Sequence, residues 1–159
     1  MTNDETQIAS FFAKYEPGVA KLGKALRAKL RDRLPGLFEL VYVYERQSSL
    51  MFSYSPTQAG ANGVCGIALH PDRVDLFVTG GARLSKSDPA KLLHGQGKTV
   101  RHVVLNSMAD FDRAEIEALI AAALKIAKVR LDPSVKGSVI FKAAEQKQRA
   151  LRAKAKSRR

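Results

Sequence analysis

The sequence predicts an α+β domain in which two helices pack on one face of a five-stranded antiparallel sheet. Three observations lead to this prediction. An amphipathic helix pattern opens the chain, segments with two-residue periodicity follow it, and a second helix pattern comes after them. The chain has 159 residues, the length of about one domain.

The first helix is predicted to begin near Pro17, because proline suits a first helical turn, where the missing N–H costs nothing. Leu34-Pro35-Gly36 ends it, since the residue before a proline is pushed out of the helical region. Its apolar stripe recurs at three- and four-residue steps: Val19, Leu22, Leu26 and Leu30. Apolar residues upstream are expected to form a short lead-in turn on the same core: Ile8, Phe11, Phe12 and Tyr15.

Five strands are predicted from alternating apolar residues and from the turn residues between them. The segments are FELVYVYE (38–45), LMFSY (50–54), VCGIAL (64–69), RVDLFVT (73–79) and VRHVVL (100–105). His70-Pro71-Asp72 is typical of a tight turn between antiparallel strands, and PTQAGANG (56–63) is typical of a flexible loop.

The first two strands carry an aromatic set, Tyr42, Tyr44, Phe52 and Tyr54. We expect these side chains to form part of the sheet core beneath the helices. The alternative is that some of them line a pocket, since ligand clefts favour aromatic walls with a few polar groups.

The second helix has a capping-box signature, with Asp112 as N-cap, Glu115 three residues later, and Phe111 and Ile116 placed to form a hydrophobic staple. Asp132-Pro133 is expected to close the segment. The predicted buried stripe consists of Ile116, Leu119, Ile120, Ala123 and Ala127.

The net charge of +12 is concentrated at the end of the chain, because residues 136–159 hold nine Lys and Arg residues and one acid. We therefore divide the chain into a domain of residues 1–135 and a basic C-terminal extension of residues 136–159, partly helical or disordered. VKGSVIF (135–141) has enough apolar residues to dock as a short strand or turn. The extension is predicted to attract nucleic acid or another polyanion through Lys147, Arg149, Arg152, Lys154, Lys156, Arg158 and Arg159. An anionic membrane surface, or a role in solubility alone, remains open as an alternative.

The segment LLHGQGKTVRHVVL (92–105) contains Gly-Lys-Thr but does not fit a nucleotide phosphate loop. Leu92 occupies the place of the first glycine, and a strand pattern follows where a helix is required. Gly95 and Gly97 are expected to permit positive φ where the chain turns into the last strand. The alternative is an anion or ligand site whose candidate residues are Lys98, Arg101, His102 and His94, together with Tyr42 and Tyr44.

The same region carries a family resemblance. GARLSKSDPAKLLHGQGKTVRHVVL, followed by a helix rich in Ile, Leu and Ala, resembles the second half of the YdhG-like family, a domain of unknown function. With the preceding strands and first helix, the resemblance covers roughly residues 8–131. It implies an α-β(5)-α sandwich similar to that of frataxins, and some members of the family are regarded as frataxin-like iron-handling proteins.

No reaction is predicted. Cys65, the single cysteine, lies within an apolar strand and is expected to be a buried, inert thiol. No cofactor or metal site is predicted, and no Gly-x-Ser-x-Gly elbow is present. A lone cysteine, a polar N-terminal segment and the lack of a long apolar run lead us to expect a cytoplasmic protein without a transmembrane segment.

The first hypothesis is a non-enzymatic binding or accessory protein with a site near residues 94–101 and an anion-attracting basic tail. The alternatives are a frataxin-like intracellular iron-binding protein, a non-specific nucleic-acid-binding protein, and an enzyme that uses the tyrosines and histidines around the sheet. The sequence predicts neither a ligand nor an oligomeric state.

Overall fold

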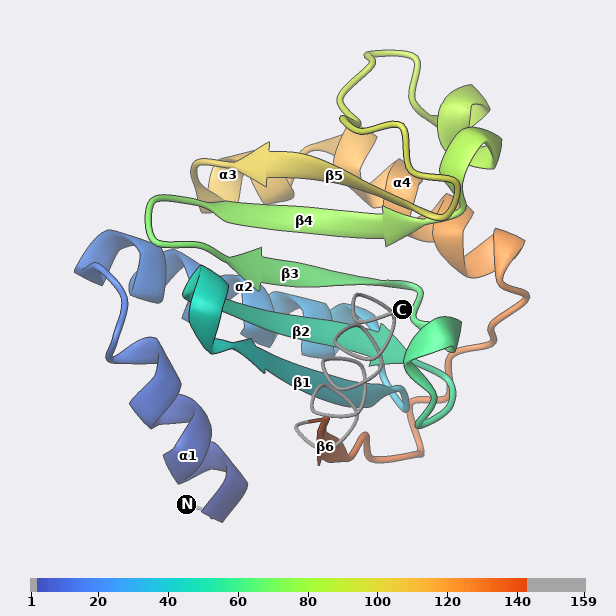
Figure 1. Ribbon diagram of the computed structural model, residues 1–159. Helices are drawn as coiled ribbons and strands as arrows, with labels where there is room; N and C mark the ends of the chain where they lie inside the picture. Colours follow the sequence, from blue (N-terminus) through green and yellow to red (C-terminus); the bar gives the residue numbers. More distant parts are fainter. Residues whose placement is uncertain (1–2, 143–159) are drawn as a thin grey trace, which may run out of the picture.

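The computed structural model of the chain describes residues 3–142, which form helices on one side of a single sheet (Figure 1). The α-helices are α1 (Asn3–Phe12), α2 (Pro17–Arg33), α3 (Met108–Phe111) and α4 (Ala114–Ile126). The strands are β1 (Phe38–Tyr44), β2 (Ser49–Ser55), β3 (Cys65–Leu69), β4 (Val74–Thr79), β5 (Val100–Leu105) and β6 (Val139–Phe141). Short 3-10 helices are η1 (Glu45–Gln47), η2 (Gly60–Asn62) and η3 (Gly81–Ser87). The predicted α+β class is confirmed.

The sheet is mixed and has six strands in the order β5-β4-β3-β2-β1-β6. The first five strands in the sequence are antiparallel to their neighbours, as predicted. The prediction of a wholly antiparallel, five-stranded sheet is wrong, because β6 pairs with β1 in parallel. VKGSVIF therefore docks as a short strand, and it covers the edge that β1 would otherwise expose. A strand of three residues has too few positions for its alternation to be recognised in advance.

Three residues of the segment 136–159 thus belong to the sheet. Lys142 continues this pairing, since its N–H donates to the carbonyl oxygen of Val41 at 3.0 Å. The predicted division at residue 135, and the expectation of a partly helical or disordered extension, stay predictions. Residues 143–159 lie outside the described residues.

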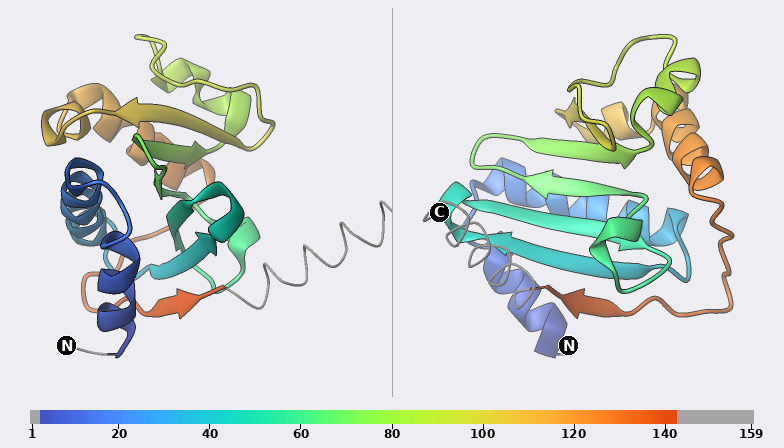
Figure 2. Two further views of the ribbon diagram at one scale, coloured as in Figure 1. Left: turned by 60° about the vertical axis from the view of Figure 1, so that its left-hand side comes forward. Right: turned by 45° about the vertical axis from the view of Figure 1, so that its right-hand side comes forward.

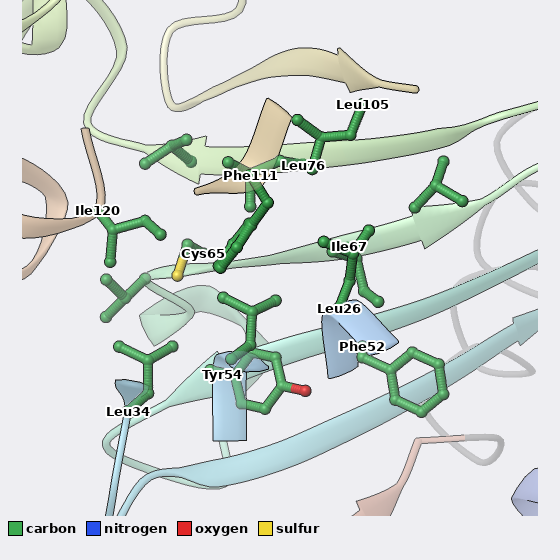
Figure 3. Packing of buried hydrophobic residues seen from close by; sticks show 14 of the residues in the cluster. Leu26, Leu34, Phe52, Tyr54, Cys65, Ile67, Leu76, Leu105, Phe111 and Ile120 are labelled. Atoms are coloured by element: carbon green, nitrogen blue, oxygen red, sulfur yellow. The ribbon is translucent and has the colours of Figure 1, made fainter. Parts of the chain in front are cut away.

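The helices pack on one face of the sheet, which buries a single core (Figure 2). Alternate strand positions point into this core: Phe52 and Tyr54 of β2, Cys65 and Ile67 of β3, and Leu76 of β4 are at most 1% exposed. Figure 3 shows them packed with Leu26 of α2 and Ile120 of α4. This two-layer arrangement follows from the alternation in the strands and the apolar stripes of the helices.

The first ten described residues form a helix, whereas a short lead-in turn was predicted. Asp4 and Glu5 lie in the first turn of α1, where carboxylates favour a helix because of its dipole. Ile8 and Phe12 are buried, and the ring of Phe12 stacks on that of Phe52 at 5.6 Å between centroids. The predicted packing on the common core is therefore confirmed, but with a full helix as its scaffold.

The second helix region begins differently from the prediction. Ser107, not Asp112, is the capping residue: its side chain accepts from the N–H of Asp110 and starts α3. Asp112 is the C-cap of α3, and α4 begins at Ala114 without a side-chain cap. The predicted buried stripe is otherwise present, but α4 ends at Ile126, so that Leu124 is buried and Ala127 is exposed.

A buried charge network connects the helices to the sheet. The guanidinium of Arg27, on α2, donates to both carboxylate oxygens of Glu39 on β1, with distances of 2.7–3.2 Å. It also donates to both oxygens of Glu5 on α1, at 2.8 and 2.9 Å. Tyr54 on β2 donates its hydroxyl to Glu39 at 2.6 Å, and Arg27 lies over the ring of Phe52. One arginine thus joins α1, α2, β1 and β2.

These charged groups can be buried only because the guanidinium of Arg27 is paired with the carboxylates of Glu5 and Glu39. Burial, and then the neighbouring Glu39 carboxylate, raise the pKa of Tyr54 well above its ordinary value, so Tyr54 stays a hydrogen-bond donor. Burial alone would lower the pKa of Arg27, but its hydrogen bonds to Glu5 and Glu39 outweigh this effect and raise the pKa.

We predict that Arg27→Met lowers the free energy of unfolding by about 3–5 kcal/mol, since it leaves the buried Glu39 carboxylate without a cation. Urea denaturation measures this loss. The double variant Arg27→Met/Glu39→Gln should regain part of it, because the amide oxygen still accepts from Tyr54 and no buried charge remains. Equal instability of the single and double variants would show that the unpaired charge is not the cause.

The network also predicts a dependence of stability on pH. The hydrogen bonds from Arg27 lower the pKa of Glu5 in the folded protein below its ordinary value of 4.5. A carboxyl with a lowered folded-state pKa stabilises the protein above its unfolded pKa and loses that contribution as the pH falls through its folded-state value. The difference in unfolding free energy between wild type and Glu5→Gln should therefore shrink as the pH falls below 4.5. Asp4→Asn, a change in the same helical turn that leaves the hydrogen bonds of Arg27 in place, is the matched control, and a convergence of equal size in this variant would contradict the assignment to Glu5.

Candidate functional site

The sheet face opposite the helices, termed the open face, carries a groove of about 380 Å³. Every described α-helix contributes residues to the core on the other face. The strand residues that line the groove come from β1, β2, β3, β4 and β5: Tyr42, Tyr44, Met51, Ser53, Ala68, Asp75, Phe77, Thr79, Val100 and His102. Gly60, Ala61 and Gly63 from the β2–β3 connection, together with Thr99, complete the lining.

Small residues in the central strands create the hollow. Ser53 on β2 pairs with Gly66 on β3, and Gly66 pairs with Phe77 on β4. A Cβ at Gly66 would collide with the carbonyl oxygen of Phe52 and the ring of Phe77. Because Gly66 has no side chain, the ring of Phe77 packs over it against the sheet and is only 9% exposed. The bottom of the groove is therefore shallow at this position.

The four residues of the predicted aromatic set fall on opposite faces of the sheet. Phe52 and Tyr54 lie in the core beneath the helices, as predicted. Tyr42 and Tyr44 lie on the open face and line the groove, which matches the alternative of a pocket wall. Their rings are nearly parallel, with an interplanar angle of 4° and centroids 6.1 Å apart. Tyr42 is buried, whereas Tyr44 is half-buried and presents part of its ring.

The structure brings His102 to this groove together with the two tyrosines. His94 lies opposite His102 in an isolated antiparallel bridge, and their ring centroids are 5.9 Å apart. Gly95 has a φ of +98°, as predicted for a turn into the last strand. Gly97 does not adopt a positive φ; its lack of a side chain instead allows close approach to the carbonyl oxygen of Val100.

The other two candidates near Gly97 do not join the groove. Lys98 is exposed in the turn before β5. Arg101 is two positions before Val103, a core residue, so it belongs to the helix side of β5. Its Nε is buried and has no hydrogen-bond partner within residues 3–142. Of the candidate residues for the alternative anion or ligand site, His102, Tyr42 and Tyr44 line the groove, whereas Lys98, Arg101 and His94 are not among its lining residues.

A hydrogen-bonded row that sequence reasoning missed closes one end of the open face. His70 Nδ1 lies 3.1 Å from Ser49 Oγ, and His70 Nε2 lies 3.1 Å from a carboxylate oxygen of Asp75. A carboxylate only accepts, so Nε2 carries a hydrogen and donates it to Asp75. Arg73 Nε also donates to Asp75. The row fixes the β3–β4 turn against β2, and Arg73 neutralises the buried Asp75 carboxylate. Ser49 is too far from the other members in sequence for the row to form a motif.

The basic extension leaves the sheet beside the groove. Lys142, the last described residue, follows β6, and its Nζ donates to the carbonyl oxygen of Gln58 at 2.8 Å. Its backbone pairs with Val41, the neighbour of Tyr42 in β1. The predicted nucleic-acid-binding residues of the extension, Lys147 to Arg159, lie outside the described residues.

Hollows elsewhere among residues 3–142 include the following two. One, of about 440 Å³ between the end of α2 and β6, reaches Glu39 and Tyr54. These groups are already hydrogen-bonded to Arg27 or to each other, so they have little capacity left for a ligand. The other, of about 570 Å³, is lined by Tyr15 and by Tyr44, and Tyr44 thus borders two hollows.

Comparisons of the chain with models of protein families, with curated proteins and with solved structures give no significant match. The resemblance to the YdhG-like family is therefore carried by its sequence features alone. Within residues 3–142, no helix is both long enough and apolar enough to cross a membrane.

Cys65 is fully buried on β3, and burial raises the pKa of its thiol to about 12. Because the thiolate is the reactive form, we predict negligible labelling of folded protein by iodoacetamide at neutral pH. Protein unfolded in urea should label at one position, since the chain has a single cysteine. Mass spectrometry distinguishes the two, and rapid labelling of the folded protein would contradict the buried position.

Proposed function

We propose that this protein is a non-enzymatic binding protein that takes single-stranded nucleic acid on the open face of its sheet. The observation that carries this proposal is the groove of about 380 Å³ lined by Tyr42, Tyr44, Phe77 and His102, beside the point where a basic segment leaves the sheet. The groove offers flat aromatic faces for bases, and the segment offers cations for phosphates.

Stacking explains the preference for a single strand. A base presents its flat face to a protein ring only when it is not stacked inside a duplex. Tyr44 and His102, both half-buried, lie toward opposite sides of the groove, on β1 and β5. Base–aromatic stacking contributes about 1–3 kcal/mol per base and tolerates any sequence, since every base has a flat face.

The distribution of charged residues also favours nucleic acid as the ligand. Asp75 is the acidic residue of the groove lining, and its carboxylate is paired with His70 and Arg73. Lys147, the first of the predicted nucleic-acid-binding cations, is five residues beyond Lys142. A fully extended chain of that length spans at most about 18 Å, so this cation is tethered close to the sheet edge. Phosphates of a strand on the open face would meet these cations.

We also propose kinship with the YdhG-like family. The succession of α2, five antiparallel strands and α4 supports this proposal, since the resemblance implied this order. We do not extend it to frataxin-like iron binding. Glu5 on α1 and Glu39 on β1 are both bound to Arg27. The segment 14–33 also carries seven Lys and Arg residues against two acids, which disfavours cations.

Fluorescence anisotropy with labelled single-stranded and duplex oligonucleotides tests the proposal. We expect a preference for the single strand and weaker binding at higher salt. Tyr44→Ala should lower the affinity by roughly tenfold or more, as expected for the loss of one stacked base. Met108→Ala is the matched control, because Met108 is a half-buried apolar residue on the helix side, away from the groove.

Deletion of residues 143–159 separates the two parts of the proposal. The shortened protein should keep its thermal unfolding midpoint, bind more weakly and show a smaller dependence on salt. If deletion abolishes binding while Tyr44→Ala leaves it unchanged, the extension alone attracts the polyanion and the open face is not the site. Equal affinity for duplex and single strand would also overturn the stacking argument.

A further inference from the structure

We propose that His94 and His102 form a two-histidine site for a divalent transition-metal ion, of the class of Cu²⁺, Ni²⁺ and Zn²⁺. The site lies at the outer edge of the sheet, where the segment before β5 returns alongside it. The inference rests on the geometry of this pair and is independent of the proposed nucleic-acid binding.

The backbone places the two side chains on the same face. The N–H of His94 donates to the carbonyl oxygen of His102 at 2.7 Å, and the N–H of His102 donates to that of His94 at 3.1 Å. Two residues that exchange both hydrogen bonds are directly opposite each other in an antiparallel pair. Directly opposite residues direct their side chains to the same side, with Cβ atoms about 4.5–5.5 Å apart.

The rings are close enough to share an ion. Their centroids are 5.9 Å apart and their planes are tilted by 42°. An ion bound at about 2.0–2.1 Å from each of two imidazole nitrogens needs those nitrogens roughly 3–3.5 Å apart. His94 is exposed and His102 is half-buried, so side-chain rotation can bring one nitrogen of each ring to this separation.

The turn leaves room for the ion. Gly95 follows His94 with a φ of +98° and has no side chain. A Cβ at this position would lie 3.7 Å from His102 Nδ1. Glycine at position 95 therefore keeps one approach to the His102 ring clear, and the positive φ gives a separate reason for glycine there.

The ligand type determines which ions fit. Imidazole nitrogen suits Cu²⁺, Ni²⁺ and Zn²⁺, whereas Mg²⁺ and Ca²⁺ require oxygen ligands. No group of three or more His, Cys, Asp and Glu side chains comes together in the part of the chain that the structure describes. The pair would therefore supply two ligands, and water or an exogenous ligand would complete the coordination sphere. For such a site, affinity should follow the order Cu²⁺ above Ni²⁺ and Zn²⁺, with Mn²⁺ far weaker.

Titration of the untagged full chain with chlorides of Cu²⁺, Ni²⁺, Zn²⁺ and Mg²⁺ tests the proposal by calorimetry. We expect one ion per chain for the first three and no binding of Mg²⁺. In ¹H–¹⁵N spectra, a substoichiometric amount of Cu²⁺ should first broaden the signals of residues around 94 and 102.

Substitutions separate this pair from other sites. His94→Ala and His102→Ala should each abolish stoichiometric binding, because one imidazole does not hold the ion. His70→Gln is the matched control and should bind like wild type, since His70 is the remaining histidine of the chain. Circular dichroism verifies that each variant is folded. Unchanged binding by either alanine variant, loss of binding in His70→Gln, or broadening centred elsewhere would overturn the proposal.

Discussion

The position of Arg27 between Glu5 and Glu39 is the interaction on which the arrangement of helices and sheet depends. A buried guanidinium must have its charge matched, and the two carboxylates come from elements on either side of it in the sequence. This requirement fixes α1 and α2 on the same side of β1. Since the remaining helices share that core, the opposite face of the sheet stays available for a ligand.

The two faces of the sheet therefore have different physical roles. The helix side is filled with apolar side chains, and its buried Glu39 and Tyr54 are hydrogen-bonded within the protein. The open face combines partly accessible rings with small residues, and it is the surface that we propose for single-stranded nucleic acid. Gly66 matters to the sheet and to its open face. Its lack of a side chain permits close packing against the backbone of Phe52 and leaves space for the Phe77 ring.

Local sequence patterns predicted the elements but not how distant segments combine. The stripe of α2, strands β1 to β5 and the buried Cys65 follow from periodicity, which depends on near neighbours in the chain. The parallel β6, and the row of Ser49, His70 and Asp75, depend on pairings that no local pattern encodes. Asp112 is not the cap of the long helix because it ends α3, the short helix that Ser107 starts, and α4 begins only after Arg113. Tyr42 and Tyr44 were predicted as candidate site residues. The pairing register of β1 with β2 places them on the opposite face of the sheet from Phe52 and Tyr54.

The contact between Phe11 of α1 and Phe141 of β6 joins the beginning of the chain to its last strand, with ring centroids 6.4 Å apart. During synthesis, β6 is made only after the other elements of the sheet and the helices. The side of α1 that contacts Phe141 therefore stays uncovered until that strand has been made. The packing of β6 on α1 is the step that completes the domain.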